Sequence, residues 1–547
     1  MSERRAAIVG LALATLAAAI WLFSLDSHLT FIADDWELLV KRHGWGADYY
    51  FDPYHENIVV GPAIVYRALL LAFGMGSSLP FYVVSIGLFL TSAVLLFALL
   101  RRRVGDWPAL VAAVLVLFLG AAFEDLLWAF QMGYFGSMVA GLGMLLALDR
   151  EDERGDAIAC ALLAVSLAFS SLGLTFGVGA AVEIATGRRP RARRAFVALL
   201  PFALYALWWV GWGHTAESDF SLDNIAGLPE FVYNAASAGI VSLLGLATGD
   251  GSEPDQPHLI WGQLLLLPVL AGIGWRVYRE RGLPRGLAIA LALGVFFWVS
   301  AALVQNADRL PTSSRYQYGS AVFLLLIAAE TLRGLRVPRL AVGVAAGVTV
   351  FALTGGIPLA EREYEERWRP TGEYLRSTLA AVDIAGESAQ PGYRIAFAPT
   401  PVATAARYLD AKADYGTPAY TEGELEARPA AEKEGADLTL AQALGLALRE
   451  PAPGDRTIAC EPLQASAEGP TGVTLLQGGF TLANETGGDV EVVLSRFAGG
   501  FPVSLGPLPA GVTTALEIPV DGSERPWNLG LKGEGPVRLC TTEPAAP

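Results

Sequence analysis

Apolar segments alternate with short polar loops over residues 1–358, and this alternation limits the fold more than any other feature of the chain. Charged residues make up only 17% of the sequence, whereas a soluble domain has roughly a quarter. The sequence therefore predicts a polytopic α-helical membrane protein with about eleven transmembrane helices, each equal to or approaching the ~20 residues that a span needs. The predicted spans are 6–25, 79–100, 107–122, 134–148, 157–170, 173–186, 195–212, 259–275, 286–304, 319–333 and 340–358.

Arginine-rich loops predict how these spans are oriented. With eleven spans, all of these loops fall on one side, which the positive-inside rule makes cytoplasmic. They are residues 101–103, 150–154, 188–194, 276–285 and 333–339. Arg4 and Arg5 place the N-terminus on that side, so we expect a multi-pass plasma-membrane protein with an extracytoplasmic C-terminal part. All five histidines fall on the outer side or at its edge: His28, His43, His55, His214 and His258. The net charge of −15 argues against a nucleic-acid partner.

The first predicted outer loop, residues 26–78, carries the carboxylate pair Asp34-Asp35 directly after the first span. Ionised groups at a membrane are costly, so they face water or a functional cavity by default. We interpret this pair as functional, with solvated loop acids as the alternative. His55 and Glu56 follow in the same loop, and residues 58–73 predict a helix that either lies on the membrane surface or packs inside the protein.

The second outer loop places another acidic pair, Glu124-Asp125, among aromatic residues that include Trp128. Two acidic pairs on one membrane face could bind a divalent cation (Mg²⁺, Mn²⁺ or Ca²⁺) through oxygen ligands, with Asp35, Glu124 and Asp125 as candidates. One carboxylate could instead act as a general base. Solvated acids, or ion pairs with Arg67 and Arg309, are the structural alternative.

A third outer loop, residues 305–318, breaks the arginine-inside pattern with Arg309 and Arg315. A guanidinium suits phosphate recognition because it offers two parallel hydrogen bonds. The alternative is anchoring to lipid head groups, with Tyr316 and Tyr318 in an aromatic belt.

The polar remainder of the chain predicts two further parts. Residues 359–455 read as a mixed α/β segment, and 456–547 contain short alternating segments separated by turns, as in a β-sandwich. Cys460 and Cys540 could form a disulfide in an extracytoplasmic domain, with two free thiols as the alternative. Trp527 and Tyr420 could stack on a sugar ring, although packing is the favoured role. Asn484 begins a glycosylation sequon, a motif common by chance.

Taken together, the outer loops resemble those of the GT-C superfamily of polytopic glycosyltransferases, over about residues 1–358. The matching motifs are Asp34-Asp35-Trp36, His55-Glu56-Asn57, Glu124-Asp125 with Trp128 and Gln131, and Ser314-Arg315-Tyr316, the last as in bacterial members. The resemblance implies a GT-C-like bundle with its active site on the non-cytoplasmic face. It implies that Asp34 or Asp35 is the catalytic base, or a metal ligand in metal-dependent branches. It also implies that Arg309 or Arg315 stabilises a polyprenyl-phosphate leaving group.

The resulting hypothesis is a membrane hexosyl- or pentosyltransferase of cell-wall glycan biosynthesis. It would move a sugar from a polyprenyl-phosphate donor to a hydroxyl of a glycan or lipid acceptor. We expect Arg309, Arg315, Tyr316, Trp128, Gln131, His55 and Glu56 to bind substrate. A transporter or flippase for lipid-linked glycans is one alternative, disfavoured because no clear internal repeat is present. A non-catalytic sugar-binding membrane protein is the other.

Overall fold

The chain packs into two compact units, seen in a computed structural model that describes residues 3–42, 46–187, 189–249, 258–335, 337–395, 403–453, 456–467, 469 and 472–543. The helical unit comprises Met1–Leu29, Gly44–Leu69 and Leu79–Arg369. The C-terminal unit comprises Pro370–Pro547 together with two segments from early in the chain, Thr30–His43 and Leu70–Ser78. The predicted division into 1–358, 359–455 and 456–547 places those two early segments with the membrane helices.

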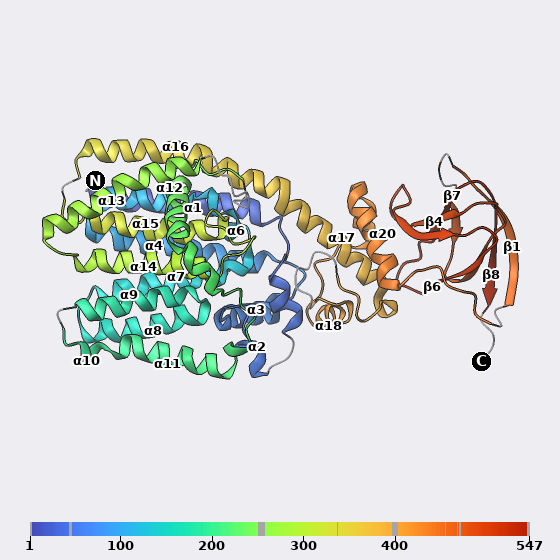
Figure 1. Cartoon of the computed structure of the whole chain (residues 1–547), viewed down its shortest axis with the longest axis horizontal. Helices are drawn as coiled ribbons and strands as arrows, with labels where there is room; N and C mark the ends of the chain where they lie inside the picture. Colours follow the sequence, from blue (N-terminus) through green and yellow to red (C-terminus); the bar gives the residue numbers. More distant parts are fainter. Residues whose placement is uncertain are drawn as a thin grey trace. The chain divides into compact units, whose positions relative to one another are not determined.

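The helical unit consists of helices packed side by side (Figure 1). The helices are α1 (Glu3–Asp26), α2 (Ala47–Phe51), α3 (Val60–Phe73, whose last residues belong to the C-terminal unit), α4 (Leu79–Val104), α5 (Asp106–Leu117), α6 (Phe123–Leu126), α7 (Met132–Leu148), α8 (Glu153–Phe169), α9 (Leu172–Thr186), α10 (Arg191–Arg194), α11 (Phe196–Gly211), α12 (Leu228–Leu243), α13 (Leu259–Glu280), α14 (Arg285–Leu303), α15 (Gln317–Thr331) and α16 (Arg339–Glu363). Each of the eleven predicted spans coincides with one of these helices.

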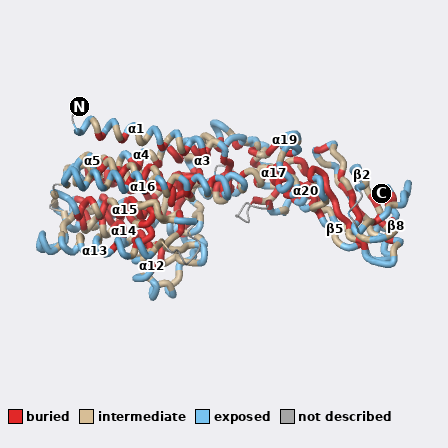
Figure 2. Tube along the Cα trace, turned by 90° about the horizontal axis from the view of Figure 1, so that it is seen from above, coloured by how far each residue is buried: buried red, intermediate tan, exposed pale blue. Residues whose placement is uncertain are grey.

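The helical unit has the apolar surface of a membrane protein. Within the described part of the chain, six helices are long and apolar enough to cross a bilayer, or seven if the bent pair Asp106–Leu117 and Gly120–Leu126 counts as one span. The crossing of all eleven segments therefore stays a prediction. Leu207, Leu340 and Val350 are 69%, 80% and 64% exposed. Figure 2 shows α13 and α16 mostly in the exposed and intermediate colours, as expected of lipid-facing helices.

One helix was missed by the sequence prediction, which treats residues 213–258 as a loop. Helix α12 lies in that stretch, and small residues let it pack closely: Gly239 lies against Ser320 of α15. Just before α12, Asn224 donates to the carbonyl of Leu303 at the end of α14. Just after it, Thr248 lines a small cavity with Thr312 of the loop before α15. Both ends of α12 therefore lie at the same end of the bundle, which preserves the predicted alternation of the other helices.

The arginine-rich loops gather at one end of the helical unit, which we call the basic end. Arg103 in the last turn of α4 bonds to Asp149, directly after α7, and to Glu330 of α15. Arg285 at the start of α14 bonds to Glu183 of α9 and Glu151, and Arg339 pairs with Glu3 near the N-terminus. This clustering is what the predicted topology requires. Which side of the membrane the basic end occupies stays a prediction.

The C-terminal unit combines helices with a β-sandwich (Figure 1). Two antiparallel four-stranded sheets have the orders β1-β8-β3-β6 and β2-β7-β4-β5, the strand order of a jelly roll. The elements are α17 (Arg369–Ala385), α18 (Ala405–Tyr415), α19 (Glu422–Glu426), α20 (Ala430–Leu444), β1 (Arg456–Ala465), β2 (Val473–Leu475), β3 (Gly478–Asn484), β4 (Val490–Ser495), β5 (Val503–Leu508), β6 (Thr513–Ile518), β7 (Trp527–Lys532) and β8 (Gly535–Glu543).

A disulfide joins Cys460 of β1 to Cys540 of β8, at directly paired positions of the two strands. Of the two alternatives for these cysteines, the bridged one is therefore correct. The third cysteine, Cys160, is a buried free thiol in α8.

Three residues of the C-terminal unit that raised the question of glycan chemistry have structural roles. Trp527 is fully buried beneath the Arg496 guanidinium. Tyr420 packs against two guanidinium groups: the Cζ atoms of Arg376 and Arg428 lie 4.0 and 4.9 Å from its ring centroid. The buried Asn484 amide donates to the carbonyls of Gly488 and Leu508. The aromatic rings therefore pack rather than stack on a sugar, and the sequon amide is occupied within the fold.

Candidate active site

The end of the helical unit opposite the basic end brings two predicted site residues into direct contact; we call it the site end. The carboxylate of Glu124 in α6 accepts the backbone N–H of Arg315 at 3.0 Å and its Nε at 3.3 Å. The Ser314 hydroxyl accepts the backbone N–H of Glu124 and donates to the carbonyl of Ala121. These bonds tie the second and third predicted outer loops together and fix the base of the Arg315 side chain, which is 38% exposed.

A second contact joins the first and third predicted loops. Nη1 of Arg309 lies 3.3 Å from both carboxylate oxygens of Glu56 and 3.4 Å from Asp219. Burial would raise the pKa of Glu56, but the backbone N–H of Asp219, at 2.8 Å, and the charge of Arg309 outweigh it and lower the pKa. His55, beside Glu56, is exposed and has a left-handed φ of 45°. Such backbone strain in a non-glycine residue is often found at functional sites.

Asp125 differs sharply from its neighbour Glu124. Its side chain is only 1% exposed, and neither carboxylate oxygen has a hydrogen-bond partner among the residues that the structure describes. The hydroxyl of Tyr134, in the adjoining helix α7, is likewise buried without a partner in the described part of the chain. A polar group left in this state costs free energy, so native proteins keep few of them.

Three other residues expected to bind substrate, Trp128, Gln131 and Tyr316, also lie at the site end. Trp128 is buried and packs against Phe130 and Trp368 at ring-centroid distances of 5.9 and 6.1 Å. Tyr316 packs against Phe297, and burial raises the pKa of its hydroxyl. Gln131 is half-buried at the start of α7. The guanidinium of Arg67 lies over the ring of Tyr49.

Asp34 and Asp35 belong to the C-terminal unit, and the structure distinguishes them. Asp35 is fully buried, and its Oδ2 accepts the backbone N–H of Ile32 at 2.9 Å, whereas Asp34 is half-buried. Ala33 directly before them has a left-handed φ of 48°. A π-helix, Glu37–Lys41, begins after Trp36, and such turns are frequent at functional sites. Asp35 therefore stabilises a strained turn, and Asp34 is the more accessible acid.

A divalent cation is neither supported nor opposed by this arrangement. Among the residues that the structure describes, no three His, Cys, Asp or Glu side chains form a metal-binding group. Of the three candidate ligands, Glu124 and Asp125 are adjacent in the helical unit, and Asp35 belongs to the C-terminal unit. Metal binding by these residues stays a prediction. His43, which belongs to the same predicted outer loop as Asp35, lies outside the described residues.

Comparison with known proteins gives only distant likenesses. No protein-family model matches the chain, and no curated protein matches its sequence. Among solved structures, the apo oligosaccharyltransferase of Archaeoglobus fulgidus has a TM-score of 0.44 and 16% identity, covering 69% of this chain and 58% of that one. The archaeal oligosaccharyltransferase AglB of the same organism, in complex with an inhibitory peptide and a dolichol-phosphate, has a TM-score of 0.43 and 14% identity, covering 79% and 68%. The chain thus spans less than two-thirds of the first structure, and these likenesses do not assign a family.

Proposed function

We propose that this chain is a GT-C-type membrane glycosyltransferase that uses a polyprenyl-phosphate sugar and an extracytoplasmic acceptor hydroxyl. The observation that supports this most is the Glu124–Arg315 contact. It holds a partly exposed guanidinium in a fixed position at one end of an apolar bundle. A lipid phosphate lies at the membrane surface, where such a guanidinium can bind it through paired hydrogen bonds.

The reaction has a leaving group that suits these arginines. The acceptor oxygen would attack the anomeric carbon while a carboxylate takes the hydroxyl proton, and the bond from that carbon to the phosphate oxygen would break. Negative charge then develops on the departing polyprenyl phosphate. Arg315, with Arg309 as the second candidate, would stabilise that charge, an effect that is large when the donors are held in place beforehand.

The catalytic base is assigned to Asp34 or Asp35 on the family resemblance. The greater exposure of Asp34 makes it the better candidate for contact with an acceptor. Asp35 would then position it through the turn that contains Ile32. A divalent cation bound by Asp35, Glu124 or Asp125 is an alternative route to the same charge stabilisation.

The remaining candidates would bind the substrates. Glu56 would keep Arg309 oriented toward the phosphate, and His55 would contact the sugar or the acceptor. Trp128, Gln131 and Tyr316 would line the sugar site. The orientation of the site toward the extracytoplasmic side agrees with the Cys460–Cys540 disulfide, since disulfides persist in oxidising compartments.

The test begins with lipid analysis of a strain that lacks the gene, which should accumulate a polyprenyl-phosphate sugar. Complementation with Asp34→Asn should lower glycan product by about 10²- to 10⁴-fold at normal expression, the range of general-base catalysis. Asp35→Asn should also lose activity, and Arg315→Ala should lose activity without loss of folding. Asp308→Asn is the matched control, because Asp308 is an exposed acid of the arginine loop. Wild-type product from both Asp34→Asn and Asp35→Asn would contradict the assignment.

A further inference from the structure

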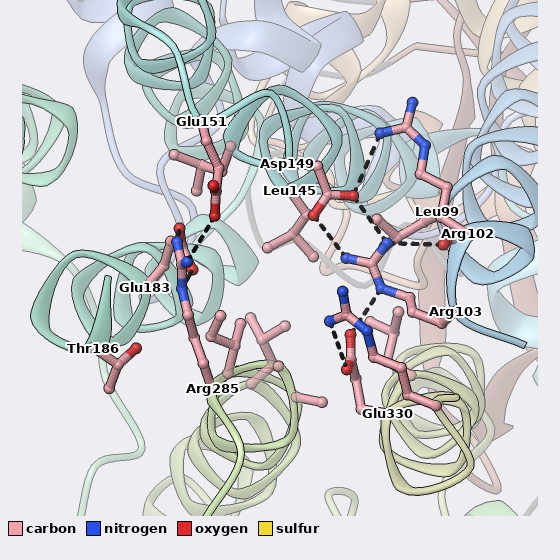
Figure 3. A pocket seen from close by; sticks show the side chains of 17 residues that line it. Leu99, Arg102, Arg103, Leu145, Asp149, Glu151, Glu183, Thr186, Arg285 and Glu330 are labelled. Atoms are coloured by element: carbon pink, nitrogen blue, oxygen red, sulfur yellow. Dashed lines mark hydrogen bonds and ion pairs between the residues drawn. The ribbon is translucent and has the colours of Figure 1, made fainter. Parts of the chain in front are cut away.

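The basic end of the helical unit contains a cavity of about 600 Å³ that shares no lining residue with the candidate active site. Its walls come from α4, α7, α9, α14 and α15 (Figure 3). Neither the proposed transfer reaction nor the site end uses this space.

Two charged clusters face each other across the cavity (Figure 3). In one, Arg103 donates to Asp149 at 2.9 Å and to Glu330 at 2.7 Å. In the other, Arg285 donates to Glu183 at 2.7 Å and to Glu151 at 2.9 Å. Apolar side chains lie between the clusters (Figure 3), and the apolar lining residues are Leu99, Leu145, Leu148, Ile289, Ala290, Leu293 and Leu326. A ligand that fills this space therefore needs both a charged group and a hydrocarbon part.

Two further arginines are placed to bind a phosphate. Arg102 and Arg333 are 52% and 53% exposed, and each makes one long ion pair within the described part of the chain, to Asp149 at 3.4 Å and to Glu330 at 3.3 Å. A guanidinium has five N–H donors, so most of the donors of these two side chains are available. Glu151, 56% exposed, offers carboxylate oxygens on the opposite wall.

The positive and negative charges that line the cavity are equal in number, and this limits the chemical class of the ligand further. Four arginines are matched by four acids: Arg102, Arg103, Arg285 and Arg333 against Asp149, Glu151, Glu183 and Glu330. A purely anionic ligand would meet as many acids as arginines, whereas a zwitterion is complementary to both. The lining residues include no aromatic side chain, so they form no cage for a quaternary ammonium. A primary ammonium can instead donate hydrogen bonds to the carboxylates.

We propose that this cavity binds one membrane phospholipid with a phosphoethanolamine head group. The phosphate is bound by Arg102 and Arg333, and the ammonium by Glu151 on the opposite wall. The first methylenes of the acyl chains cover the apolar lining around Leu293. This binding site lies at the basic end and does not depend on the transferase function.

The test measures lipid binding by native mass spectrometry of the full chain in detergent. We expect one phosphatidylethanolamine per chain, phosphatidylcholine bound at least tenfold more weakly, and no displacement by millimolar inorganic phosphate. Arg102→Ala and Arg333→Ala should each weaken phosphatidylethanolamine binding by about five- to tenfold. Ala290→Phe, which fills the apolar side of the cavity, should abolish it.

The matched control is Arg150→Ala, which removes a half-exposed arginine of the same end that pairs with Asp152 and does not line the cavity. Its lipid binding should equal that of the wild type. Equal binding of the two lipids, displacement by phosphate, or the same loss in Arg150→Ala as in Arg333→Ala would each overturn the proposal. Since the two arginine variants alter exposed side chains, they test it even if Ala290→Phe fails to fold.

Discussion

Buried acids at the two ends of the helical unit have opposite surroundings. At the basic end, Asp156 and Glu183 are 3% and 5% exposed. The fully buried guanidinium of Arg194 bonds to both, at 3.1 and 3.3 Å. Arg189 adds a second bond to Asp156, and Arg285 a second partner for Glu183. Every charge in this group is matched, as stable buried ion networks require.

At the site end, Asp125 is buried to the same degree without such partners among the described residues. Asp26, at the end of α1, shares this state. Burial alone therefore does not mark a functional acid, because the buried acids of the basic end belong to structural ion pairs. A buried carboxyl that lacks hydrogen-bond partners is a better indicator of function, since its burial destabilises the fold and forms no structural contact in return.

The largest expected effect is on stability at the basic end. Asp156→Ala leaves the Arg194 guanidinium buried with one carboxylate fewer, and breaking a buried pair in this way costs about 3–5 kcal/mol. Unfolding of the detergent-solubilised protein, followed by tryptophan fluorescence, would measure it. Glu280→Ala is the control, because it removes a half-exposed pair with Arg276 and should change stability by less than about 0.5 kcal/mol. A loss below 1 kcal/mol for Asp156→Ala would mean that the two ends do not differ.

The second prediction concerns Asp125. A neutral amide is less costly to bury than a carboxylate, so Asp125→Asn should leave stability unchanged or raise it by about 1 kcal/mol. Glycan transfer should fall by about 100-fold if the carboxylate acts on the substrates or a bound cation. The two measurements together decide the role of Asp125. Parallel losses of stability and activity would show that Asp125 is structural, like Asp156.

The sequence predicts the helices well where they are long and apolar, because such segments leave no alternative to a buried or membrane helix. It misses α12, whose small and polar residues are buried largely against α13, α14 and α15. The residues of Leu228–Leu243 by themselves give no indication that these helices surround them.

The candidate site was predictable in its residue types and only partly in its contacts. The loops that hold Glu124 and Arg315 were expected on one face, but no local pattern reports a pair 191 residues apart. Proximity in sequence also places Asp34 and Asp35 with the first span, whereas Thr30–His43 packs into the C-terminal unit. The sequence could not report the exposure of Trp527, so sugar stacking stayed open beside the favoured packing role; the structure shows that Trp527 is fully buried.

The smallest expected effect is a pH dependence at the site end, where the partly solvated Arg309–Glu56 pair contrasts with the sealed network around Arg194. The pKa of Glu56 is lower in the folded protein than its ordinary value of 4.5. The contribution of Glu56 to the free energy of unfolding is therefore fully present above pH 4.5, and it is lost as the pH falls through the pKa of Glu56 in the folded protein. Solvent screening limits the contribution to about 0.5 kcal/mol.

Thermal unfolding between pH 7 and pH 3 should show a slightly larger acid-induced loss for the wild type than for Glu56→Gln. The exposed acid Glu217, substituted as Glu217→Gln, should retain the wild-type profile. If Glu56→Gln loses as much stability in acid as the wild type, then other carboxylates carry the acid sensitivity. The Arg309–Glu56 contact would in that case orient the arginine without stabilising the fold. Such a result would sharpen the contrast with the basic end, whose ion pairs stabilise the bundle itself.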